Sequence, residues 1–124
     1  MPPANNSSGN YSDKGVYKIK CKDCNRMYIG ETGRSLSKRL KEHKADVRKN
    51  KMFSAVANHV NSELHEMDFS SAKIVYPCRD RSKRRIVESS LIICNTNCLN
   101  FNKGFCPLNT MVCNAVCQSL DLKL

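Results

Sequence analysis

Residues 15–30, GVYKIKCKDCNRMYIG, decide the fold of this chain. Two runs, V-Y-K-I at 16–19 and M-Y-I at 27–29, are rich in the β-branched and aromatic residues that favour strands. Between the runs lies a C-x-x-C, Cys21 and Cys24, whose neighbouring Lys, Asp and Asn residues suit a tight turn. The stretch therefore predicts a β-hairpin with one tyrosine on each strand and two thiols at the connection.

Downstream of the hairpin, helical and strand patterns alternate. Residues 36–50 carry a narrow apolar stripe at helical spacing, formed by Leu36, Leu40 and Val47, and Ser35 is a suitable N-cap for that helix. Residue composition and the turn-forming residues between segments predict the remaining elements. These are a short helix over 53–60, a third strand over 68–76, a helix that begins in the basic run 79–85 and continues to 93, and a short helix over 111–124.

The composition indicates one basic domain. The chain has 124 residues, 40% of them apolar, and its net charge of +10 comes from 21 Lys+Arg against 11 Asp+Glu. This excess favours a polyanionic partner, most simply nucleic acid, although a soluble basic surface has the same composition. Since no apolar run approaches the ~20 residues that a membrane span needs, we expect no membrane partner.

Eight cysteines in so short a chain would suit a secreted disulfide framework. No apolar segment of the signal-peptide kind follows Met1, however, and histidines follow the C-x-x-C. We therefore expect reduced thiols and an intracellular location, nuclear or cytoplasmic, without secretion. The expected organisation is a disordered lead at 1–13, a domain at 14–103 and a Cys-rich extension at 104–124.

The tripeptides Gly15-Val16-Tyr17 and Tyr28-Ile29-Gly30 resemble the two motifs of the GIY-YIG nuclease domain, in the order of that family. The resemblance continues through an arginine and a histidine on the first helix, a glutamate on a later helix and an asparagine beyond it. It implies an α+β fold, a small three-stranded antiparallel sheet flanked by helices, and a metal-dependent DNA endonuclease. The catalytic residues that it implies are Tyr17, Tyr28, Arg39, His43, Glu88 and Asn100, with Asn102 as the alternative to Asn100.

These residue types suit phosphodiester hydrolysis, which needs a deprotonated water, a cation on the phosphate oxygens and help for the leaving oxygen. Glu88 offers the hard oxygen ligand that Mg²⁺ (or Mn²⁺) would use, and Arg39 can hold the phosphate through two N–H donors. Tyr17 is the candidate general base. We expect Arg39, the metal and His43 to favour its phenolate, while Tyr28 and His43 position or relay the proton. The cations expected on DNA are Arg34, Lys38, Arg84 and Arg85.

A second group of residues suits zinc. Cys21 and Cys24 have the spacing of half a tetrahedral site, and His59 and His65 could supply the other half, which would tie the hairpin to the second helix. The alternative is two free thiols and two unrelated histidines. A C-x-x-C between the tripeptides, followed by two histidines, also resembles the endonuclease of Penelope-like retroelements. That resemblance implies a reverse transcriptase in cis in a longer parent protein.

Two other functions fit the same sequence. One is a catalytically silent, zinc-stabilised DNA-binding module, in which each catalytic candidate has an ordinary surface or core role. The other is an interaction domain, stapled by zinc or disulfides, with no nucleic-acid partner. The tail cysteines are interpreted as small buried hydrophobic residues, with a second metal site as the alternative: Cys94, Cys98, Cys106, Cys113 and Cys117.

Overall fold

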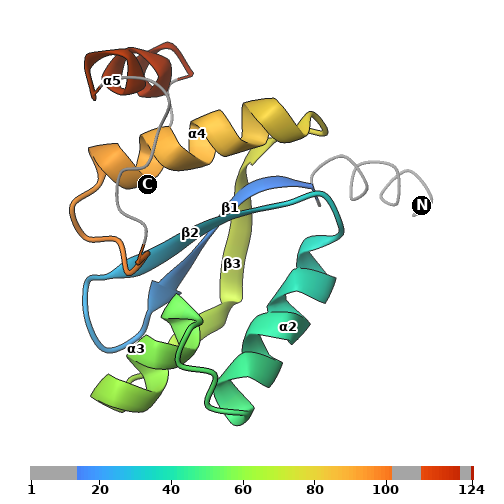
Figure 1. The fold of residues 1–124 in the computed structure, drawn as a ribbon, viewed down its shortest axis with the longest axis vertical. Coiled ribbons are helices and arrows are strands. Elements are labelled where there is room, and N and C mark those ends of the chain that lie inside the picture. Colours follow the sequence, from blue (N-terminus) through green and yellow to red (C-terminus); the bar gives the residue numbers. More distant parts are fainter. Residues whose placement is uncertain (1–13, 102–109, 121–123) are drawn as a thin grey trace.

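The computed structural model describes residues 14–101, 110–120 and 124. Its centre is an antiparallel sheet in the order β2-β1-β3. The strands are β1 (Gly15–Cys21), β2 (Met27–Thr32) and β3 (Met67–Pro77). Helices α2 (Leu36–Arg48) and α3 (Ala55–Glu63) lie on one side of the sheet, and α4 (Arg81–Cys94) and α5 (Thr110–Ser119) lie on the other (Figure 1).

The predicted α+β fold, with its hairpin and its small three-stranded antiparallel sheet flanked by helices, is confirmed. The expected disordered lead at 1–13 falls outside the described residues, as do Asn102 and Cys106. No helix within the described ranges is both long enough and apolar enough to cross a membrane.

Local capping explains where the helices begin and end. α3 begins two residues later than predicted because the Ser54 hydroxyl accepts a hydrogen bond from the backbone N–H of Ala57 at 3.3 Å. α4 begins at Arg81 because the side chain of Asp80 caps it. α2 ends at Arg48 and not at residue 50, where Asn50 adopts a left-handed φ of 53°.

Alternation along β1 sends its side chains into two separate cores. Tyr17 and Ile19 pack with Val56 of α3 and with the predicted apolar stripe of α2. Val16 points to the opposite face of the sheet, where it packs with Leu91 of α4. β1 is therefore covered on both faces, and its two faces pack against different helices.

A segment without regular structure, residues 97–101, runs beside the edge strand β2. The backbone N–H of Leu99 donates to the carbonyl of Met27 at 2.7 Å. The side-chain amide of Asn100 then bonds both backbone groups of Ile29, accepting from its N–H at 3.1 Å and donating to its carbonyl at 2.6 Å. This pairing, which the sequence did not predict, fixes the chain after α4 against β2.

Gly30 is required where the Tyr17 ring crosses the neighbouring strand, because the two residues are directly paired. A Cβ on Gly30 would lie 2.5 Å from the Tyr17 hydroxyl oxygen and 2.6 Å from its Cζ. We predict that Gly30→Ala lowers the free energy of unfolding by about 1–3 kcal/mol, the usual cost of overpacking a core. Urea denaturation of the purified protein measures this loss.

Two further variants test the cause of that loss. Tyr17→Phe in the Gly30→Ala background should recover part of the stability, because it removes the oxygen nearest to the new Cβ. Gly33→Ala should cost less than Gly30→Ala, because its Cβ would meet only the end of the long Arg84 side chain. Equal costs at the two glycines, with no recovery in the double variant, would contradict this explanation.

Candidate active site and metal-binding cluster

A cavity of about 390 Å³ lies among β2, α2, α4 and the segment after α4. Its walls include side chains from parts of the sequence that the sheet and the helices bring together. Of the six residues that the sequence nominated as catalytic, all except Tyr17 line it. The polar and aromatic members from those elements are Tyr28, Arg39, His43, Asp46, Glu88, Ser89, Asn100 and Phe101.

Tyr17 lies directly behind this wall and is fully buried. Its hydroxyl is 2.7 Å from Nε2 of His43, which is 2% exposed. The Tyr28 ring packs against both, with centroids 5.1 Å from His43 and 6.2 Å from Tyr17. The other ring nitrogen of His43, Nδ1, is buried without a hydrogen-bond partner among the described residues. The tyrosines and the histidine thus form one packed group beside the cavity.

Burial controls the protonation of this group. It raises the pKa of Tyr17 well above its usual range, and neighbouring Tyr28 adds to the effect, whereas the charge and hydrogen bonding of Arg39 oppose it. The lowering by Arg39 that the sequence analysis expects is present, and among the side chains alone desolvation outweighs it. The expected phenolate also depends on a bound metal ion, so it stays a prediction. Burial also lowers the pKa of His43 to about 4, so its imidazole is neutral at physiological pH.

Arg39 is held in place by a residue that the sequence analysis missed. Its guanidinium donates to a carboxylate oxygen of Glu42 at 2.9 Å, and the other oxygen of Glu42 accepts from Arg34 at 2.5 Å. Hydrogen bonding from Arg34 holds the pKa of Glu42 below its usual range. The i,i+3 spacing of Arg39 and Glu42 on a helix was the available signal. Glu42 therefore positions the arginine at the cavity.

Glu88 supplies the carboxylate of the cavity. Burial raises the pKa of Glu88 to about 7, and the negative charge of Glu31 raises it further, while Arg85 and Arg39 oppose the shift. Burial disfavours the ionised form of such a half-buried carboxyl group, and a bound cation would stabilise that form. The donor at this position therefore fits a hard divalent metal ion.

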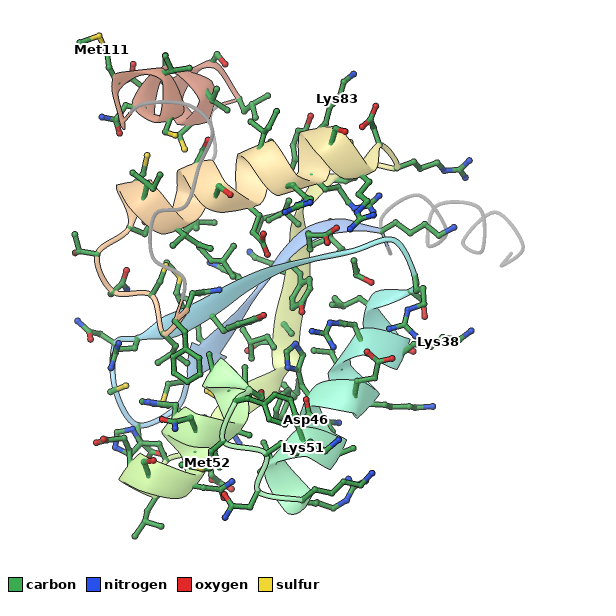
Figure 2. All side chains as sticks on the ribbon, in the orientation of Figure 1. Lys38, Asp46, Lys51, Met52, Lys83 and Met111 are labelled. Atoms are coloured by element: carbon green, nitrogen blue, oxygen red, sulfur yellow. The ribbon has the colours of Figure 1, made fainter. Side chains whose placement is uncertain are left out.

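The four predicted DNA-contacting cations have different surroundings. Lys38 and Arg85 are exposed, and Figure 2 shows Lys38 on the outer side of α2. The side chain of Arg34 is 57% exposed, although it pairs with Glu42. Arg84, in contrast, is buried, and its Nε donates to Glu31 at 2.7 Å while Nη1 donates to the carbonyl of Arg79 at 2.6 Å. Arg84 is a structural residue in this fold, so it is not available as a surface contact for DNA.

The second cluster lies at the hairpin turn. The ligand atoms of Cys21, Cys24, His59 and His65 all lie within 4.8 Å of one another. Nε2 of His59 is 3.4 Å from the Cys21 sulfur, 3.6 Å from the Cys24 sulfur and 3.3 Å from Nδ1 of His65. In a tetrahedral zinc site, bond lengths of about 2.3 Å to sulfur and about 2.0–2.1 Å to nitrogen separate the ligand atoms by about 3.3–3.8 Å. The residues therefore fit a four-coordinate metal ion.

Comparison with known proteins gives a family match for most of the described domain. The model of the GIY-YIG catalytic domain matches residues 13–89, more than half of the chain. The matched region begins just before β1 and ends inside α4, so it includes the hairpin and Glu88 and leaves out the segment that pairs with β2. No curated protein and no solved structure matches the chain.

The low pKa of His43 predicts an acid-dependent loss of stability. The unfolded chain binds this proton near pH 6.5 and the folded protein only near pH 4, so stability from this group is complete above 6.5 and declines as the pH falls towards 4. Between pH 7.5 and 5.5 we predict a loss on the order of 1 kcal/mol that the neutral variant His43→Gln lacks. Urea denaturation of both proteins at the two pH values measures the difference, and equal pH dependence would contradict it.

Proposed function

Because this chain belongs to the GIY-YIG catalytic domain family, a family of nucleases, we propose that it is a metal-dependent endonuclease that hydrolyses phosphodiester bonds in DNA. One observation carries this proposal: an arginine, a carboxylate, a tyrosine and a histidine from distant elements line a single cavity, and the histidine is hydrogen-bonded to Tyr17 behind its wall. The net charge of +10 supports a polyanionic substrate.

In this proposal each side chain has a defined part in the reaction. Arg39, held by Glu42, binds the scissile phosphate and stabilises the charge that develops on it. Nε2 of neutral His43 accepts a hydrogen bond from the Tyr17 hydroxyl, and Tyr17 could act as the general base on the attacking water once the charge of Arg39 and of a bound metal ion favours its phenolate. Glu88 would hold the metal ion. When bound, Mg²⁺ or Mn²⁺ supplies positive charge to the phosphate oxygens and to the water.

The biological setting is a finer proposal. The order of the tripeptides, the C-x-x-C and the two histidines supports an origin in a Penelope-like retroelement. In that setting the enzyme nicks one strand, and the new 3′ hydroxyl primes reverse transcription by a polymerase in a longer parent protein. We place this activity inside the cell, in the nucleus or cytoplasm, where cysteine thiols stay reduced.

A zinc ion is the metal that we propose for the second cluster. Two thiolates and two imidazoles form a closed tetrahedral set, which is the donor combination of structural zinc sites. Two backbone hydrogen bonds support the turn: Lys22 N–H donates to the Glu66 carbonyl at 2.8 Å, and Asp23 N–H donates to the Cys21 sulfur at 3.4 Å. The ion would join the hairpin to α3 and to the start of β3, with a structural role.

One observation favours a second function. The Tyr17 side chain is fully buried and does not line the cavity, and burial raises its pKa. A zinc-stabilised module that binds DNA without cleaving it would need no phenolate, and its exposed cations would suffice for binding. The two functions differ in whether a divalent metal ion produces nicked DNA.

Nicking of supercoiled plasmid in the presence of Mg²⁺ tests the proposed catalytic roles. We predict that Glu88→Gln, Arg39→Ala and Tyr17→Phe each lower the nicking rate by about a hundredfold or more, because each removes a group that acts on the reacting atoms. Quantified gels of nicked against supercoiled DNA give the rates.

Glu63→Gln is the matched control for Glu88→Gln. It makes the same chemical change at an exposed glutamate at the end of α3, outside the cavity beside Tyr28 and Arg39, and should keep the wild-type rate. If Glu88→Gln nicks as fast as Glu63→Gln, the catalytic assignment is wrong. If the wild type binds DNA without nicking it, the silent module replaces the nuclease.

The metal content of the purified protein tests the zinc proposal. We predict about one zinc ion per chain by elemental mass spectrometry. Cys21→Ser and His59→Ala should lose the ion together with several kcal/mol of unfolding free energy, because a structural ion contributes directly to folding. Cys78→Ser, a half-buried thiol outside the cluster, should keep both the ion and the stability. A native protein that contains no metal when prepared without chelator would disprove the zinc proposal.

A further inference from the structure

Two exposed aromatic side chains line the candidate active site. Phe53 and Phe101 are wall residues of the cavity that contains Arg39 and Glu88, yet they are 77% and 59% exposed. Among the described residues they are the two exposed aromatic side chains. A single exposed hydrophobic residue needs no explanation. Two rings from distant segments at one polar cavity suggest a ligand with flat, apolar faces.

Hydrogen bonds of neighbouring residues hold the backbone that carries both rings. Phe101 directly follows Asn100, whose amide is bonded to both backbone groups of Ile29, so its position is fixed against β2. Phe53 lies in a closed turn, where the backbone N–H of Ser54 donates to the carbonyl of Lys51 at 2.9 Å. Rings on a fixed backbone lose little conformational freedom when they bind a ligand, which favours a role in recognition.

The charge beside the rings indicates which ligand they suit. The ammonium of Lys51 lies 5.8 Å from the centroid of the Phe53 ring, and Arg39 lies in the same cavity. Figure 2 shows Lys51 and Met52 on the connection between α2 and α3, whereas exposed Met111 lies at the far end of the molecule on α5. Aromatic rings interleaved with cations form the stacking and phosphate-binding surface of single-stranded nucleic acid sites.

We propose that Phe53 and Phe101 stack on unpaired bases beside the scissile phosphate, so that the preferred substrate is DNA with an unpaired segment at that position. This inference rests on the proposed nuclease function and names its substrate class. In continuous duplex each base is covered on both faces by its neighbours. A protein ring can therefore stack only on a base that is unpaired or has left the helix.

The test compares two fluorescently labelled duplexes of the same sequence, one fully paired and one with a central bulge of unpaired thymines. Binding is measured by fluorescence anisotropy in Mg²⁺ with the Glu88→Gln protein, so that the DNA stays intact. We expect tighter binding of the bulged duplex. Adding Phe53→Ala or Phe101→Ala should weaken that binding by roughly 5- to 100-fold, the effect of losing one base–aromatic stack, and change binding of the paired duplex less than about twofold.

Four further substitutions decide whether stacking is the cause. Phe53→Trp and Phe101→Trp keep a flat ring and should retain the preference for the bulged duplex, whereas Phe53→Leu keeps only apolar character and should lose it. Met111→Ala removes an exposed apolar side chain far from the cavity and should have no effect. Equal losses on both duplexes, or full binding by the leucine variant, would overturn the proposal.

The outcomes also separate this inference from the nuclease function. If the wild-type protein nicks plasmid but the alanine substitutions do not weaken binding of the bulged duplex more than binding of the paired duplex, the substrate class is wrong and the nuclease stands. If the wild-type protein neither binds these duplexes nor nicks plasmid, both proposals are wrong. Nicking by the wild type together with selective loss of bulge binding in the variants supports both.

Discussion

A phenol ring that lies across a glycine of the neighbouring strand sets the geometry of this molecule. The ring of Tyr17 crosses β2 at Gly30, and any side chain there would strike its hydroxyl. This close approach leaves the ring fully buried and directs the hydroxyl towards His43 on α2. A strand residue and a helix residue thereby become hydrogen-bonded partners, and α2 is placed so that Arg39 enters the same site. The positions of His43 and Arg39 follow from this contact, whereas Asn100 is held by its hydrogen bonds to Ile29.

The same strand links the two functional clusters. Tyr17 and Cys21 project from one face of β1, four residues apart, so the strand carries a candidate active-site residue and a candidate metal ligand in fixed register. Ligands on α3 and in the loop before β3 complete the second cluster. An ion bound there would restrain the Cys21 end of β1, whereas the first tripeptide motif lies at its Gly15 end. Metal binding at the turn would therefore act on the active site by stabilising the strand that supports it.

In the absence of a ligand, burial disfavours the charged forms of the titratable side chains in and beside the cavity. Desolvation raises the pKa of Glu88 to about 7 and lowers that of His43 to about 4, while the pKa of Tyr17 rises above its ordinary range. Each group is therefore held in, or close to, its neutral form. A site of this kind has the most to gain from a bound cation and phosphate, because charges interact strongly where water is excluded. The exposed rings at the rim add a surface for bases beside this site.

The sequence by itself determined the hairpin and the approximate positions of the helices, because strand alternation and capping are local properties of the chain. The C-x-x-C spacing indicated half of the metal cluster, and the resemblance of the two tripeptides to the nuclease family supplied the motif residues. The tertiary structure alone decided other features. Arg84 is buried against Glu31, Asn100 is bonded to Ile29, and Phe101 reaches the cavity from the segment after α4. The first two contacts join residues more than fifty positions apart. The place of Phe101 depends on the second of them. No local pattern encodes how closely two distant backbones approach, and that approach determined which arginine is structural and which aromatic rings border the site.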